Sequence, residues 1–385
     1  MVMLSRSSQK GLQKVAHFFG TATMQKVIDQ FLKKIPLDFL PAHKKSKYSN
    51  YAIFFVLLFA GITECAPSWS AQALQSFGSL VPSVDTAFRI LESISENKMT
   101  QFINVQLQTL PRCFPKVNHK HRPKNTYLII DFHRDSSYSR IHPKGVTKGQ
   151  PKNSTQYAWS YLVAELLIGQ RRQTIAIVLR HKNERIVDHV SRLFAEIPDR
   201  IHFHAVIFDG EFPTVDVLRF FHEKHLHFLG RFPARGDFKQ IMNHAGDSPE
   251  AKAKRFWIQT SITNKQNEDA FFEVTWEWTP GGPKLLIKDI EWNLTIHSAE
   301  KIYGKRFNIE SGFRDAHLFQ PRTNSSNISV RLMLIFIGKV WENMMEYCSE
   351  GESKGTVRRQ LMMKQIRTFK FHALFEMVAI ASVMT

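Results

Sequence analysis

The first 110 residues carry apolar side chains at intervals of three and four positions, for example Val27 and Phe31. This spacing places the apolar side chains on one face of a helix, so the region is predicted to be all-helical. Two consecutive candidates are residues 71–80 and 82–91, the second with Ser83 in position to cap its first turn. Such a pair is typical of a DNA-binding helix-turn-helix, and equally of two ordinary helices in a small bundle.

From residue 126 onward the pattern changes to short apolar runs separated by amphipathic segments. Strands are predicted at residues 126–131, 157–168, 174–179, 202–208 and 227–232, with helices at 184–196 and 214–224. The run at 157–168 also fits a short helix. Three strands, a helix, a strand, a helix and a strand follow one another in the order of an RNase H-like core. The chain is therefore predicted to be an α/β protein whose mixed sheet is flanked by helices.

Residues 255–292 alternate apolar and polar side chains, which predicts a β-rich insertion with a turn at Gly281-Gly282-Pro283. A helical stretch is predicted from about residue 299 to 345, with a break at Pro321. The predicted division of the chain is residues 1–111 as a helical DNA-binding region, 112–230 as the first part of the catalytic core, 231–297 as the insertion, 298–348 as the second part of the core, and 349–385 as a basic helical tail.

The chain is strongly basic. Its 385 residues include 52 Lys and Arg against 34 Asp and Glu, a formal net charge of +18. The positive charge is concentrated in residues 1–50, 112–152 and 351–372. Such clusters indicate a polyanionic partner, most plausibly nucleic acid, although a basic protein without a polyanionic partner would show the same total.

The cysteines and the longest apolar run indicate a cytoplasmic protein without a membrane span. Cys65, Cys113 and Cys348 lie far apart, so neither a disulfide framework nor a zinc knuckle is predicted. That usage fits a reducing cytosol, and no signal peptide is apparent. The apolar run at residues 51–63 is too short for a comfortable membrane span and is predicted to be a buried helix.

Three carboxylates are candidates for a shared site. Asp131 follows Leu-Ile-Ile and Asp209 follows Val-Ile-Phe, so each is predicted to end a central strand. A rigid sheet can direct such groups at one point, and Glu310 would reach the same place from a helix. Three carboxylates can hold two divalent cations, which activate an attacking water or 3′-hydroxyl and stabilise the leaving oxygen. Taken singly, each acid would be read as a turn former, a helix cap or a surface residue.

The segment from Tyr303 to His317 gathers charged and aromatic side chains on one side of a predicted helix. At about 100° per residue, the side chains of Arg306, Glu310, Arg314 and His317 all fall within about 60° of Tyr303. A carboxylate surrounded by cations and a tyrosine suits a metal ion and a phosphate at the same place.

The spacing of Tyr303, Arg306 and Glu310 resembles the Tyr-x2-Arg-x3-Glu-x6-Lys signature of one group of DDE insertion-sequence transposases. The last position of the signature is His317 here, which departs from the lysine. A histidine is positive only part of the time near neutral pH. Arg314, one helical turn after Glu310, could take over the phosphate contact of that lysine.

The resemblance covers residues 125–348, and the helical N-terminal region in outline. It implies an RNase H-like catalytic domain that performs cut-and-paste DNA transposition: metal-dependent cleavage at the ends of an insertion element, then strand transfer of the 3′-hydroxyl into target DNA. It assigns Asp131, Asp209 and Glu310 as catalytic residues that hold two Mg²⁺ ions, with Mn²⁺ as a substitute, and Tyr303, Arg306, Arg314 and His317 as DNA-binding residues. The implied partners are terminal inverted repeats, target DNA and a second copy of the chain in a synaptic complex. The implied location is the prokaryotic cytoplasm, in association with the nucleoid.

Two other functions fit the same residues. One is a catalytically inactive DNA-binding relative that acts as a regulator, which the basic clusters and His317 favour. The other is a metal-dependent nuclease without strand transfer. Two further segments each have two interpretations. Trp276 and Trp278 would stack on a displaced base or form a small core. Residues 134–152 would form a strand-connecting loop that holds DNA phosphates, or a solvated hairpin.

Overall fold

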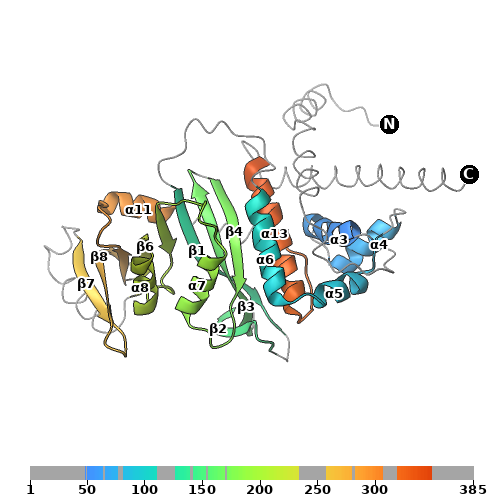
Figure 1. Ribbon diagram of the computed structural model, residues 1–385, viewed down its shortest axis with the longest axis horizontal. Helices are drawn as coiled ribbons and strands as arrows, with labels where there is room; N and C mark the ends of the chain where they lie inside the picture. Colours follow the sequence, from blue (N-terminus) through green and yellow to red (C-terminus); the bar gives the residue numbers. More distant parts are fainter. Residues whose placement is uncertain are drawn as a thin grey trace, which may run out of the picture. The chain divides into compact units, whose positions relative to one another are not determined.

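The computed structural model describes residues 48, 50–63, 66–76, 81–110, 126–138, 142–152, 155–169, 171–233, 257–279, 282–306 and 319–348. The chain divides into two compact units, one formed by Met1–Arg122 with Leu318–Thr385 and the other by Pro123–His317. In the described residues the first unit is helical, and the second contains all of the strands (Figure 1).

The helical unit brings together elements from both ends of the chain. Its described helices are α3 (Asn50–Thr63), α4 (Pro67–Ser76), α5 (Val84–Glu92), α6 (Glu96–Thr109) and α13 (Ile328–Cys348). α13 contacts α3, α5 and α6. Phe336 of α13 meets Phe54 of α3 and Phe102 of α6 at ring-centroid distances of 6.2 and 6.0 Å. Trp341 donates its indole N–H to the carbonyl of Leu58 at 3.0 Å. The predicted N-terminal helices therefore share their core with a helix that follows the sheet in sequence.

The apolar run at residues 51–63 lies in α3, and its side chains from Ala52 to Ala60 are all buried. The prediction of a buried helix is confirmed. Among the described residues, no helix combines the length and the apolar character that crossing a bilayer requires.

The predicted cap of the second helix candidate is also present. The Ser83 side chain accepts the backbone N–H of Thr86 at 3.4 Å at the start of α5. α4 and α5 are in contact, as both interpretations of this pair require.

The second unit is built on a mixed sheet of nine strands in its described part. The strands are β1 (Thr126–Ser136), β2 (Val146–Lys152), β3 (Thr155–Ile168), β4 (Arg171–Leu179), β5 (Ala205–Phe208), β6 (His227–Phe232), β7 (Ile258–Thr263), β8 (Asp269–Thr279) and β9 (Gly282–Lys288). Their order is β2-β3-β1-β5-β6-β9-β8-β7, and β4 also pairs with β3. The β1–β5 and β5–β6 pairs are parallel. The strands of the predicted insertion extend the same sheet, because β9 pairs antiparallel with β6.

Helices cover both faces of the central strands. Leu128 and Ile130 of β1 belong to a core formed with α7 (Ile186–Ala195) and α8 (Val215–Glu223). Tyr127 and Ile129, which alternate with them, belong to a second core formed with α11 (Ile296–Gly304). Two buried faces explain why β1 reads as a continuous apolar run. The predicted α/β architecture, a mixed sheet flanked by helices, is confirmed.

Local boundaries differ from the prediction in the first hairpin. β1 does not end at Asp131 but continues to Ser136, because its whole length pairs with β3. Residues 146–152, predicted to lie in a connecting loop, form β2 on the other side of β3. The sequence of β2, Val-Thr-Lys-Gly-Gln-Pro-Lys, has no apolar alternation, so its strand conformation comes from pairing with β3.

Candidate active site

Asp131 and Asp209 lie side by side on adjacent parallel strands. The register of β1 and β5 pairs Tyr127 with Ala205 and Ile129 with Ile207. Asp131 comes two residues after Ile129, and Asp209 comes two residues after Ile207. The two aspartates therefore lie at the same level of neighbouring strands, which are about 4.8 Å apart. Asp209 directly follows β5, as predicted. Asp131 lies inside β1 and gains the same position from the parallel pairing.

Asp131 is buried and holds an arginine from a distant part of the chain. The exposed fraction is 7% for Asp131 and 7% for Arg306. Arg306 Nη1 donates to Asp131 Oδ2 at 2.9 Å, and the backbone N–H of Phe132 donates to Asp131 Oδ1 at 2.7 Å. Both carboxylate oxygens of Asp131 therefore accept a hydrogen bond inside the protein.

The end of α11 brings Arg306 to this position. The Thr295 side chain caps the first turn of α11 by accepting the N–H of Ser298 at 3.3 Å. At the other end, the N–H of Arg306 donates to the Tyr303 carbonyl at 2.9 Å, which tightens the last turn. α11 ends at Gly304, so Arg306 lies in the turn after the helix and not on it. The predicted helix running from residue 303 to Arg306 and beyond is wrong at this point.

Burial opposes the ionisation of both carboxyl groups, and the charge of Asp209 further opposes that of Asp131. Burial raises the pKa of Asp131 to about 7, the neighbouring charge of Asp209 adds to the rise, and the Arg306 guanidinium lowers it in part. Burial also raises the pKa of Asp209, although the N–H of Glu211, which donates to Asp209 Oδ1 at 2.9 Å, acts in the opposite direction. A cation between the two acids would favour the charged form of both. Carboxylate oxygens are the ligands that Mg²⁺ prefers, so this pair fits a divalent cation.

Tyr303 lies below the aspartates in the core between α11 and the sheet. It is buried with Tyr127, Ile129 and Ile207, and burial raises the pKa of its hydroxyl. The guanidinium of Arg306 lies 5.6 Å from the centre of the Tyr303 ring. In this structure Tyr303 therefore supports the arginine that contacts Asp131.

Further charged side chains lie near Asp131 and Asp209, and they were only partly predicted. Glu211 accepts a hydrogen bond from Arg134 Nη2 at 2.6 Å. The guanidinium groups of Arg134 and Arg180 lie 5.7 and 5.2 Å from the ring centre of Phe132. Phe132 lies on the face of the sheet that packs against α7 and α8. Both arginines are linked to the site through Glu211, whose backbone N–H donates to Asp209: Arg134 donates to its carboxylate, and Arg180 interacts with its charge. Arg134 belongs to residues 134–152, which were predicted to hold DNA phosphates or to form a solvated hairpin, whereas Arg180, which follows β4, was not predicted.

The remaining predicted site residues are Glu310, Arg314 and His317, which lie outside the described residues. Within the described ranges, no group of three or more His, Cys, Asp or Glu side chains is arranged to hold a metal ion. The structure thus brings together Asp131, Asp209, Tyr303 and Arg306 of the predicted set.

Two histidines of the second unit and two tryptophans of the predicted insertion take structural positions. His133 is buried, with its ring 6.2 Å from that of Tyr161. Trp276 packs against the core beside α8, which favours the core interpretation for this residue, whereas the side chain of Trp278 lies outside the description. His204 packs edge-to-face on Trp292 at 5.4 Å.

Comparison with known proteins supports the fold. No protein-family model matches the chain, and no curated protein matches it. The structure is similar to the cryo-EM structure of the piggyBac transposase synaptic complex with hairpin DNA, with a TM-score of 0.50 and 12% sequence identity. The similarity covers 93% of this chain and 80% of that chain. The chain therefore has the predicted RNase H-like α/β fold found in a transposase.

Proposed function

We propose that this protein is a DNA transposase that cleaves the ends of a mobile element and joins the freed 3′-hydroxyl to target DNA. The observation that carries the proposal is the pair of aspartates at one level of parallel strands, with Asp131 buried, Asp209 half-buried and Arg306 bound to Asp131. Its RNase H-like fold, similar to that of a transposase solved with DNA, supports the same conclusion.

The chemistry proposed for the site is metal-assisted phosphoryl transfer. Asp131 and Asp209, joined by Glu310, would hold two Mg²⁺ or Mn²⁺ ions, which lower the pKa of an attacking hydroxyl and stabilise the leaving oxygen. Arg306 would hold a phosphate near the carboxylates, because its guanidinium already lies beside Asp131. The basic surroundings offset the repulsion between carboxylates and a phosphodiester.

The finer assignment is to the group of DDE transposases with the Tyr-Arg-Glu-Lys signature. It rests on the spacing of Tyr303, Arg306 and Glu310. We further propose that the terminal inverted repeats are bound by a dimer in a synaptic complex, and that the protein acts on the nucleoid of a prokaryotic cell. Arg314 and His317 would contribute further phosphate contacts.

Cleavage of a DNA fragment that carries the element's ends tests the proposal. With Mg²⁺, the wild-type protein is expected to release the element, whereas Asp209→Ala should lower the cleavage rate by about 1,000-fold or more. The reason is that bound metal contributes several kcal/mol to transition-state stabilisation, and each 1.36 kcal/mol is tenfold in rate. DNA binding by Asp209→Ala should persist.

The matched control is Asp199→Ala. It removes an exposed acid from the turn before β5, at the opposite end of the central strands from Asp209. It should cleave like the wild type. Full cleavage by Asp209→Ala would defeat the catalytic assignment.

A DNA-binding regulator without cleavage is the second candidate. The observation that favours it is the Arg306–Asp131 ion pair, because the guanidinium occupies a carboxylate oxygen that a metal would need. This candidate predicts a protein–DNA complex with no nicking in Mg²⁺ or Mn²⁺. A nuclease without strand transfer would instead yield cut ends and no joined product.

A further inference from the structure

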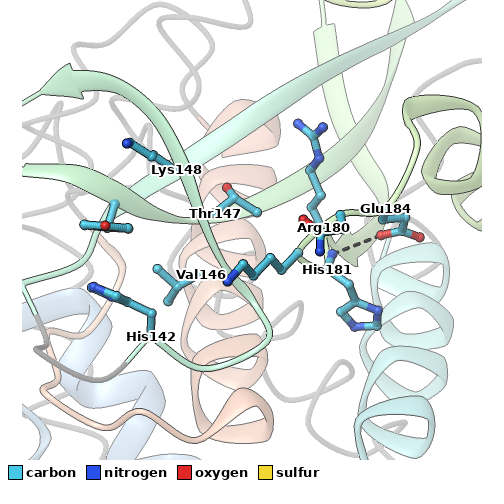
Figure 2. Close-up of a pocket in the computed structure, with 10 residues that line it drawn as sticks. His142, Val146, Thr147, Lys148, Arg180, His181 and Glu184 are labelled. Atoms are coloured by element: carbon cyan, nitrogen blue, oxygen red, sulfur yellow. Dashed lines mark hydrogen bonds between the residues drawn. The ribbon is translucent and has the colours of Figure 1, made fainter.

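A basic pocket lies beside the candidate active site, between the β2–β3 hairpin and the loop from β4 to α7. Its volume is about 450 Å³ (Figure 2). Lys148 of β2 faces its register partner Tyr157 of β3 across the hairpin. The N–H of Lys182 in the opposite loop donates to the Lys144 carbonyl at 2.9 Å, which ties that loop to the turn before β2. The pocket therefore has walls fixed by backbone pairing.

The charge of the pocket is positive. Its lining includes the cations Lys148, Arg180 and Lys182, with Glu184 as the acid. Glu184 is already neutralised, because Arg192 donates to its two carboxylate oxygens at 2.7 and 2.9 Å. Burial opposes the ionisation of Glu184, but these bonds and the N–H of His181 outweigh it, and its pKa is lowered. The lining cations therefore exceed the acids and suit an anionic ligand.

The pocket also contains a stacked aromatic pair. The rings of His142 and Tyr157 lie parallel within 18° at a centroid distance of 3.8 Å. Cations next to aromatic rings are the combination that binds a nucleic acid strand, since phosphates take the charges and bases stack on rings.

Arg180 connects the pocket with the aspartates. It follows β4 directly, and β4 ends at Leu179, which pairs with Tyr161 of β3. Tyr161 in turn pairs with His133 of β1, two residues after Asp131. The pocket therefore lies about two strand spacings, roughly 10 Å, from the strand that carries Asp131.

We propose that this pocket binds the backbone of the DNA strand on which the active site acts, a few nucleotides from the cleaved phosphate. Successive phosphates of one strand lie about 3.4 Å apart along the duplex axis, so the separation corresponds to roughly two to four nucleotides. The proposal rests on the proposed function for its choice of DNA as the polyanion. It adds a contact that positions the strand independently of the metal site.

The first test measures DNA affinity against salt. Fluorescence anisotropy of a labelled element-end duplex is recorded over a range of NaCl concentrations for the wild type and for Lys148→Ala/Lys182→Ala. Both lysines are exposed, so the substitutions leave the core intact. The double variant should bind at least tenfold more weakly at 100 mM NaCl, roughly the effect expected for two lost phosphate contacts. The slope of log affinity against log salt should fall by about 2, since each phosphate contact contributes about 0.9.

The matched control is Arg200→Ala/Lys224→Ala. It removes the same charge from exposed positions before β5 and β6, at the opposite end of the central strands. It should keep the affinity and the slope. Equal losses in the two double variants, or no loss in either, would overturn the pocket assignment. Tighter binding of an RNA duplex of the same sequence would overturn the choice of DNA.

The second test replaces single phosphates by neutral methylphosphonates along the strand. Wild-type affinity should fall at positions two to four nucleotides from the cleavage point, and the pocket double variant should be insensitive there. Uniform sensitivity of both proteins would contradict the proposal. Failure of the wild type to cleave in Mg²⁺ or Mn²⁺ would count against the proposed function, while the salt comparison still decides the pocket.

Discussion

Ionisation of Asp131 in the candidate site is unfavourable. Asp131 is a buried acid whose pKa is raised to about 7, first by burial and then by the charge of Asp209. The apolar residues before Asp131 and Asp209 were enough to predict that these two aspartates lie close together. The contact of Asp131 with Arg306 was not predictable, because it joins residues 175 positions apart through the end of α11. The sequence indicates which side chains are unusual, and tertiary structure decides which of them meet.

The raised pKa predicts how the stability of the metal-free protein depends on pH. The folded state holds the proton of Asp131 more tightly than the unfolded state, whose pKa is near 3.8. Protonated Asp131 therefore makes its full contribution to the free energy of unfolding below pH 3.8. This contribution falls as the pH rises and is lost above pH 7. Asp131→Asn removes this pH dependence, so its free energy of unfolding relative to wild type should rise by about 2–3 kcal/mol between pH 5 and pH 8.

Hydrogen exchange of peptides from β1 and β5, measured in chelator at the two pH values, follows the local stability. Asp199→Asn, an exposed acid, serves as the control and should show no such trend. A difference between Asp131→Asn and wild type that stays constant from pH 5 to pH 8 would contradict the burial argument.

At the scale of elements, parallel pairing of β1, β5 and β6 sets the site. Short continuous apolar runs predicted these strands well, since both faces of the central strands are buried under helices. β2 was missed because its residues are polar and only pairing with β3 defines it. The end of α11 at Gly304 was also not predicted. The spacing of charged residues after Tyr303 favoured a continuous helix and does not reveal the hydrogen bonds that tighten the last turn.

Gly230 of β6 leaves room for Phe208, the residue before Asp209. A Cβ at position 230 would lie 2.0 Å from a ring carbon of Phe208. Phe208 is fully buried and packs against Phe212, Phe221 and Phe228, so its ring has no space to move. Gly230→Ala should therefore destabilise the sheet unit by about 1–3 kcal/mol, the usual cost of overpacking, and displace Asp209.

Urea unfolding and DNA cleavage check this prediction together. Gly304→Ala is the matched control, because no atom lies within 4 Å of a Cβ built at that glycine. Gly230→Ala with wild-type stability and wild-type cleavage would show that Phe208 does not hold Asp209 in place.

At the scale of the whole molecule, charge predicted the kind of partner and element order predicted the fold. The net charge of +18 predicted a polyanionic partner, and the order of strands and helices predicted the fold later matched by a transposase structure. The joining of α13 to the N-terminal helices was not visible in the sequence. Its apolar residues could pack against any exposed core, and only the tertiary contacts select one.

We propose that Asp131, Asp209 and Glu310 share divalent cations where β5 ends beside β1. Crystals grown with Mn²⁺ and an element-end duplex, measured at a wavelength where manganese scatters anomalously, locate the metal directly. We expect anomalous peaks about 2.0–2.2 Å from carboxylate oxygens of all three residues, in the range of Mg²⁺-type coordination, with Arg306 moved from Asp131 to a phosphate. Crystals with bound DNA, no manganese between these carboxylates and an intact Arg306–Asp131 ion pair would contradict it.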